Sequence, residues 1–453
     1  MQSVTFVTEP LLHPDFVQYQ IVAPLLSRLR GRWDPELAAP VLSKEVIRSL
    51  EDQGIRAVSG AARFPRWLRN SRDEIPSYVW SWARDSVFGW NRKVLQRALK
   101  GRDSVRVNFS MTSALESDCW YIQSRPLGPG LDAMRPGVDW PLWLALSALG
   151  PFVDRVDWRH IVRMSDLAGH VYASSGHVAR WFGEHRVRID GVFPIYYSPT
   201  FRPTTASPSR DYILGYLGKE TDAGAMKMLL DTGLPVRLFG AKSAGWVGSI
   251  LRGRESANVR ALGHVSPEEL RDLYTNALVT AFPFTEESFG LVPVESMACG
   301  TPVLTYGTQG PGESVLDGKT GWTVETAEEL VGRAKELFRD GYPQGFQRSC
   351  LVRARDFSLE RAWSNWEKLL ASIAGDRSSA WAVPTGSGSE RGIGPAPRRR
   401  SLRLRRRQRQ TAASESATSQ TAPVGGPPPK GRSRARPEGS SHRRPAGALV
   451  RAT

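Results

Sequence analysis

The sequence has little of what marks secreted, membrane-spanning or metal-clustered proteins. Its three cysteines, Cys119, Cys299 and Cys350, share no metal-ligand spacing. No segment reaches the roughly 18 apolar residues that a spanning helix needs. The opening MQSVTFVTEP lacks a basic stretch followed by an apolar run. These absences argue against a disulfide framework, a zinc site and a secretory leader, so we expect a cytoplasmic protein with reduced thiols.

Acidic residues are almost missing from the C-terminal end. Residues 391–453 carry 16 Lys and Arg against 2 Asp and Glu, so +14 of the formal net charge of +16 lies there. This stretch is rich in Arg, Pro, Ser and Gly and has too little apolar surface to offset the entropy of ordering. We therefore expect residues 376–453 to form a disordered tail.

Apolar runs alternate with helical patterns in the second half of the chain, over residues 211–338. Runs such as YILGYLG and LVTAFPF, separated by helices such as PEELRDLYTNA, predict a parallel sheet covered on both faces. Ser266 with Glu269 has the spacing of a helix capping box. The pattern predicts a Rossmann-like domain over residues 208–355.

The first half contains similar runs, VTFVT, VRVNFS, CWYIQS and HVYASS, which predict a second Rossmann-like domain over residues 1–200. Ligands of such sheets bind outside the carboxyl ends of the strands. The predicted fold class is therefore α/β, with two Rossmann-like domains that face each other across a ligand-binding cleft.

The stretch FPFTEESFGLVPVESMACGTPV places two glutamates around a predicted helix start. The strand LVTAFPF ends at Phe284, the following loop contains Glu287, and the helix that begins near Leu291 carries Glu295 in its opening turns. Free amides at a helix start attract an anion, while carboxylates accept hydrogen bonds from hydroxyls. A diphosphate that joins a ribose to a sugar has this layout. The alternative is that both glutamates only cap or solvate the helix start.

The run EESFGLVPVESMACGTPVL resembles the Glu-x7-Glu signature of GT-B glycosyltransferases, in particular the large retaining family 4. The similarity extends over residues 211–375 and includes the glycine-containing GTQGPGESVLDGKTGW. Residues 356–375 resemble the closing helix that returns to the N-terminal domain. The resemblance implies that Glu287 is the catalytic residue that holds the donor-sugar hydroxyls, and that Glu295 holds the ribose. It also implies that the sugar and phosphates face the amides of three residues, which are Phe289, Gly290 and Leu291.

Family members typically supply an Arg and a Lys to the diphosphate from the loop after the first strand of this domain. Here GYLGKETDAG has Tyr216 where the Arg is expected, so the phosphate role is assigned to Lys219, with Lys242 as a second cation. An ordinary surface lysine is the alternative for Lys219. The chain has no Asp-x-Asp pair, which places a divalent metal in the other large glycosyltransferase fold. We therefore expect no metal and no other cofactor.

The N-terminal half lacks the Gly-Gly often found after the first strand of this family and has TEPLLHPDF instead. Polar residues near the carboxyl ends of its predicted strands are candidate acceptor contacts. They are Glu9, His13, Asn108, Ser110 and Arg125. The alternative for each is a solvated loop residue.

Residues 61–102 hold 10 Lys and Arg against 3 Asp and Glu. Aromatic residues are interleaved with them, among them Trp67, Trp80, Trp82, Phe88 and Trp90. Basic and aromatic side chains together suit an anionic lipid headgroup layer. The resulting hypothesis is peripheral contact with the cytosolic membrane face and a lipid-linked acceptor. Core tryptophans under a solvated basic face are the alternative.

The predicted function is transfer of a sugar from a nucleotide-sugar donor to a glycan, lipid-linked or small-molecule acceptor, with the retention that the family resemblance implies. Two alternatives stay open, a nucleic-acid-binding protein that acts through its Arg-rich tail and a GT-B epimerase or phosphorylase. The basic part of the tail, residues 391–453, has no aromatic residue for base stacking, and nucleic acid is not expected as a partner of the body.

Overall fold

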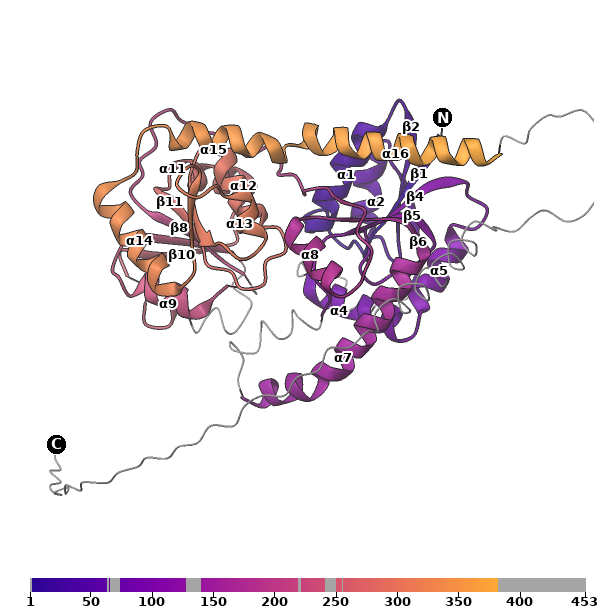
Figure 1. The fold of residues 1–453 in the computed structure, drawn as a ribbon, viewed down its shortest axis with the longest axis horizontal. Helices are drawn as coiled ribbons and strands as arrows, with labels where there is room; N and C mark the ends of the chain where they lie inside the picture. Colours follow the sequence, from indigo (N-terminus) through magenta and orange to yellow (C-terminus); the bar gives the residue numbers. More distant parts are fainter. Residues whose placement is uncertain are drawn as a thin grey trace, which may run out of the picture. The chain divides into compact units, whose positions relative to one another are not determined.

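The computed structural model describes residues 2–62, 65, 74–127, 140–218, 221–240, 250–254 and 256–381 (Figure 1). Three predicted features lie outside these residues: the phosphate contacts Lys219 and Lys242, and the tail from residue 382 onwards. Roles assigned to them therefore stay predictions.

The first sheet has seven parallel strands in the order β3-β2-β1-β4-β5-β6-β7. Its strands are β1 (Gln2–Val7), β2 (Trp33–Ala39), β3 (Arg56–Ser59), β4 (Ser104–Asn108), β5 (Ser117–Ile122), β6 (Ala168–Ala173) and β7 (Gly191–Val192). The helices of this half are α1 (Val17–Leu29), α2 (Lys44–Asp52), α4 (Glu74–Trp82), the π-helix η1 (Ala83–Val87), α5 (Trp90–Ala98), α7 (Trp140–Leu167) and α8 (Gly176–Glu184).

The second sheet has six parallel strands in the order β10-β9-β8-β11-β12-β13. Its strands are β8 (Ile213–Leu217), β9 (Val236–Gly240), β10 (Val259–Gly263), β11 (Val279–Phe282), β12 (Val303–Tyr306) and β13 (Gly321–Val324). The helices are α9 (Ala223–Leu230), α11 (Pro267–Asn276), α12 (Leu291–Ala298), α13 (Gly310–Ser314), α14 (Ala327–Asp340), α15 (Phe346–Ala354) and α16 (Leu359–Trp381), with the short 3-10 helix η3 (Arg355–Phe357).

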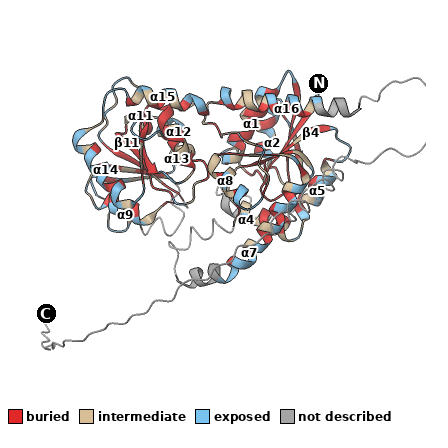
Figure 2. Ribbon diagram, in the orientation of Figure 1, coloured by how far each residue is buried: buried red, intermediate tan, exposed pale blue. Residues whose placement is uncertain are grey.

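Both sheets confirm the predicted α/β class with parallel strands. Figure 2 shows buried residues along the strands and exposed residues on the outer sides of helices such as α14, which turns Leu330, Ala334 and Leu337 inward. The strands of the first sheet lie within residues 1–200 and those of the second within 208–355. The exact domain boundaries stay a prediction.

The strand order reverses at one point in each sheet, between β1 and β4 and between β8 and β11. Loops that leave neighbouring strands in opposite directions open a crevice at the carboxyl edge of a parallel sheet, where ligands bind. In the second sheet this crevice lies between the loop after β8 and residues 283–290, which contain Glu287.

Helix α16 continues from the second half and packs on the first sheet, and it extends past residue 376. Its Trp366 is 3% exposed. The ring centroid of Trp366 lies 5.9 Å from Phe6, 5.3 Å from Phe109 and 5.2 Å from Tyr121. Two ion pairs with α16 flank this contact. Arg28 of α1 pairs with Glu360 at 3.1 Å, and Arg32, which follows α1, pairs with Glu367 at 2.6 Å.

The Trp366 contact gives a stability prediction. Trp366→Ala should lower the free energy of unfolding by about 3–5 kcal/mol, because truncating a buried aromatic loses apolar burial and leaves a cavity. The neighbouring Trp363 is only partly buried and provides the matched control. Chemical denaturation should show a clearly smaller loss for Trp363→Ala, and equal losses would contradict the assigned role of Trp366.

Candidate active site

The loop between β11 and α12 is shaped by a glycine that no other residue can replace without strain. Gly290 has φ 87° and is the N-cap of α12. A Cβ added to Gly290 would lie 2.8 Å from Cγ of Pro311. The left-handed conformation and the missing space both favour glycine, and they fix where the helix begins.

The side chain of Glu287 is hydrogen-bonded within this loop, and its amide and carbonyl are hydrogen-bonded to the start of α13. Its Oε1 accepts hydrogen bonds from the amides of Phe289 at 3.2 Å and Gly290 at 3.1 Å. Its own amide donates to Oε1 of Gln309 at 2.7 Å, and its carbonyl accepts from the amide of Gly310 at 3.2 Å. The carboxylate therefore lies against two of the amides that were predicted to face the donor.

Two helices start at the crevice of the second sheet, and only one of them has a side-chain cap. The start of α9 is capped by Asp222, whose carboxylate accepts from the amide of Ala225 at 3.0 Å and from the hydroxyl of Tyr306 at 2.9 Å. The start of α12, at Leu291, has no side-chain cap. Because Glu287 already binds the amides of Phe289 and Gly290, a phosphate at this helix would have to use the amides of the first turn, from Leu291 onward.

Glu295 lies one turn into α12 and contacts a tyrosine of the preceding helix. Its Oε2 accepts a hydrogen bond from the hydroxyl of Tyr274 at 3.2 Å. Desolvation raises the pKa of Glu295 from 4.5 to about 7, while the Tyr274 hydroxyl opposes this shift. The carboxyl is therefore poised to ionise near neutral pH.

Tyr274 is a site residue that the sequence analysis missed. It lies in the last turn of α11, is fully buried and donates its hydroxyl to Glu295. No sequence pattern marks this contact, because α11 and α12 pack together although the strands that precede them, β10 and β11, are separated by β9 and β8 in the sheet.

Three of the predicted acceptor contacts form one internal network at the crevice of the first sheet. Glu9 accepts from the hydroxyls of Ser81, Ser110 and Thr112 and from the amides of Met111 and Thr112, at 2.6–3.0 Å. Ser110 also donates its amide to Asn108 at 3.0 Å. Asn108 and Ser110 are 1% and 0% exposed. In this structure the three residues hold the loop after β4, and contact with an acceptor stays a prediction.

The other two acceptor candidates lie in different surroundings. His13 contacts Asp15 at 3.0 Å and Glu45 at 3.4 Å. Arg125 forms an ion pair with Glu286, and its amide donates to Oγ of Ser288 at 3.4 Å. Of the acceptor candidates, the structure therefore brings Arg125 next to the loop of Glu287.

Comparisons with known proteins agree with this arrangement. Residues 251–350, which contain both glutamates, match the family model of glycosyl transferases group 1. A D-inositol 3-phosphate glycosyltransferase from Rhodococcus opacus is 27% identical over 202 residues, which are 39% of this chain and 45% of that protein. The chain spans less than half the length of the curated relatives it matches.

Two solved structures show the fold. Sucrose-phosphate synthase from Thermosynechococcus elongatus aligns with a TM-score of 0.62 at 14% identity, covering 83% of this chain and 100% of that one. Anabaena HepE in complex with UDP-glucose aligns with a TM-score of 0.55 at 14% identity, covering 84% and 100%. The chain has the GT-B architecture that the sequence predicted.

Within the described ranges, no group of three or more His, Cys, Asp or Glu side chains is suited to hold a metal ion. Among the same residues, every helix is too short or too polar to cross a bilayer. The expectation that no metal is needed stays a prediction.

The raised pKa of Glu295 predicts pH-dependent nucleotide binding. Below pH 7 the carboxyl is mostly protonated, and above pH 7 the ionised form could accept the two ribose hydroxyl hydrogen bonds that the sequence predicts for it. Affinity for a nucleoside diphosphate should therefore rise by up to about tenfold between pH 6 and pH 8, in line with the ionised fraction. The diphosphate titrates as well, so the quantity to measure by calorimetry is the ratio of wild-type to Glu295→Gln affinity. A ratio that is constant over this range would contradict the prediction.

Proposed function

We propose that the protein is a retaining, metal-independent glycosyltransferase, similar to family 4, that uses a nucleotide-sugar donor. The observation that carries the proposal is the placement of Glu287 and Glu295 on either side of the start of α12, whose N-cap residue Gly290 has no side chain, at the switch point of the second sheet. The group 1 family match and the UDP-glucose complex of Anabaena HepE support a nucleotide-sugar donor.

In this proposal each group has a separate task. Glu287, already fixed through both of its peptide groups, accepts hydrogen bonds from the donor-sugar hydroxyls. Glu295 in its ionised form accepts those of the ribose. Amides at the start of α12, together with Lys219, face the diphosphate and stabilise the charge that develops as the sugar leaves. Preorganised dipoles of this kind act without reorganisation during the reaction.

The alternatives differ in what they require. A nucleic-acid-binding protein would act through the Arg-rich tail and lose affinity steeply with salt. A GT-B phosphorylase or epimerase would need no acceptor hydroxyl. A transfer assay with a tail-deleted chain separates the first alternative from ours, and product analysis separates the second.

The first test is binding of a panel of nucleotide sugars followed by variants of the two glutamates. A ligand at 100 times its dissociation constant should stabilise the protein by roughly 2.7 kcal/mol in thermal unfolding. With the donor found in this way, Glu295→Ala should weaken nucleotide binding and Glu287→Ala should mainly lower kcat. Each loss is expected to be roughly one to two decades, since a hydrogen bond to a charged group is worth about 1.5–3 kcal/mol. Wild-type turnover by both variants would overturn the site.

The structure separates the aromatic residues of the basic stretch into two groups. Trp82 is 9% exposed and donates its Nε1–H to Asp157, so it belongs to the core. Phe88 and Trp90 are 55% and 45% exposed, and their rings stack at 4.6 Å. The guanidinium of Arg84 lies 4.8 Å from the ring centroid of Trp90. Trp67 lies outside the described residues.

We propose that this surface, Phe88 and Trp90 with the surrounding cations, docks on anionic lipid at the cytosolic membrane face and presents a lipid-linked acceptor. The double variant Phe88→Ser, Trp90→Ser should reduce sedimentation with anionic vesicles, because aromatic side chains anchor at headgroup depth. All proteins are compared as residues 1–385, because the +14 of residues 391–453 would bind anionic vesicles by charge alone. Val352→Ser, an equally exposed apolar residue on α15, is the matched control. Equal vesicle binding by all three proteins would exclude docking through this surface and favour a soluble acceptor.

A further inference from the structure

A glutamate of the second half of the chain binds the start of a helix in the first half. Helices α8 and α13 lie side by side (Figure 1). Glu313 of α13 accepts from the amide of Gly176 at 2.8 Å with Oε2 and from Arg180 at 2.7 Å with Oε1. Both carboxylate oxygens are therefore used by α8, one at its first residue and one a turn later.

The start of α8 suits this contact for two reasons. Backbone amides at a helix start carry partial positive charge and favour a carboxylate. A glycine also leaves room for this contact, because a Cβ added to Gly176 would lie 2.8 Å from Oε1 of Glu313 and would displace that side chain. The N-cap residue Ser175 adds a second link, since its hydroxyl donates to the carbonyl of Ser288 at 2.5 Å.

Helix α13 is connected on its other side to Glu287. Gly310, its first residue, donates its amide to the carbonyl of Glu287, and Gln309 accepts from the amide of Glu287. The backbones of α13 and of the Glu287 loop are in close contact here, since a Cβ added to Gly310 would lie 2.4 Å from the carbonyl oxygen of Ser288. A displacement of α13 therefore moves both peptide groups of Glu287.

The far end of α13 is fixed to α15. Arg353 donates to the carbonyls of Glu313 at 2.8 Å and Ser314 at 3.0 Å. Because α15 holds its C-terminal end, we expect α13 to move as one rigid unit. A change in its contact with α8 would then also change the position of the Glu287 loop.

We propose that Glu313 is a positioning residue for Glu287: by binding Gly176 and Arg180 of α8, it holds α13 in the place that orients Glu287. The kinetic part of this inference rests on the proposed function. Glu295 is oriented by Tyr274 from α11 instead, so nucleotide affinity should depend little on Glu313. The ion pair of Arg125 with Glu286 remains when Glu313 is changed, so the two halves stay joined.

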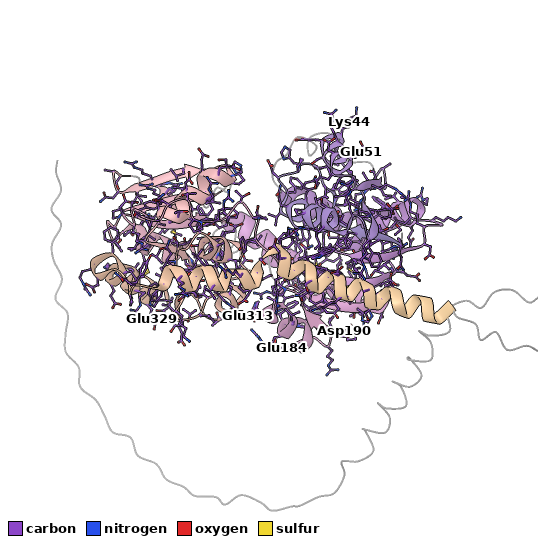
Figure 3. The ribbon with its side chains drawn as sticks, turned by 90° about the horizontal axis from the view of Figure 1, so that it is seen from above. Lys44, Glu51, Glu184, Asp190, Glu313 and Glu329 are labelled. Atoms are coloured by element: carbon purple, nitrogen blue, oxygen red, sulfur yellow. The ribbon has the colours of Figure 1, made fainter. Side chains whose placement is uncertain are left out.

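The test compares Glu313→Ala with Glu184→Ala in the full-length protein. Glu184 is an exposed acid at the opposite end of α8, and Figure 3 labels both residues. Hydrogen exchange of residues 285–291 without any ligand should become several-fold faster in Glu313→Ala and stay unchanged in Glu184→Ala. With the donor identified, kcat should fall about tenfold for Glu313→Ala, since small misplacements of catalytic groups cost up to two decades. The dissociation constant of the nucleotide should change less than about twofold, far below the losses expected for a deleted nucleotide contact.

Three further variants test the contact between Glu313 and α8. Arg180→Ala should have a smaller effect than Glu313→Ala because the Gly176 contact remains, and the double variant should behave like Glu313→Ala alone. The effect of Glu313→Gln should be larger than that of Arg180→Ala and smaller than that of Glu313→Ala. The glutamine side chain keeps an acceptor for the amide of Gly176 and loses the charge that pairs with Arg180.

Several outcomes would overturn the inference. Wild-type exchange in residues 285–291 of Glu313→Ala would show that α13 does not hold the loop. Nucleotide affinity that falls in step with kcat would show that Glu313 contacts the ligand directly. If no donor is turned over by the wild-type protein, the proposed function fails, and the exchange measurement still decides whether Glu313 positions the loop.

Discussion

The close approach of two backbone segments beside the loop after β11 constrains the rest of the candidate site. Neither Gly290 nor Gly310 has room for a Cβ, against Pro311 and against the carbonyl of Ser288 respectively. This contact joins the loop of Glu287 to the start of α13 and sets where α12 begins. Glu295 then follows at a fixed place on α12, where it meets Tyr274. The positions of the Glu287 and Glu295 carboxylates therefore depend on glycine at positions 290 and 310.

Local features of the second half could be predicted from the sequence because their causes are local. The run LVTAFPF is apolar enough for a central strand, and β11 is fully buried. The capping box of Ser266 and Glu269 is present with both of its hydrogen bonds. Alternation of such strands with helices leaves few arrangements other than a parallel sheet. The two-sheet GT-B architecture followed from these patterns together with the resemblance to a known family.

Contacts between distant residues could not be predicted in the same way. Glu9 was a plausible acceptor contact because it ends the first strand at a ligand-binding edge. Its five donors come from residues 72–103 positions further along the chain, and no sequence pattern shows that they meet there. Arg125 was named for the same reason and instead pairs with the neighbour of Glu287. Arg125 and Glu286 are about 160 residues apart in the sequence, so their ion pair depends on how the two halves of the chain pack.

The cap of α9 has a consequence for the polarity of the crevice. Asp222 places a carboxylate at one helix start, where Tyr306 keeps it in position, while the start of α12 opposite has no side-chain cap. At α9 an anion would meet the carboxylate of Asp222, and at α12 it would meet the amides that follow the pair bound by Glu287. In the proposed donor site this asymmetry gives the bound molecule a direction, because its phosphates are drawn toward the first turn of α12 and away from Asp222. Charge alone would then orient the ligand before any group recognises its base.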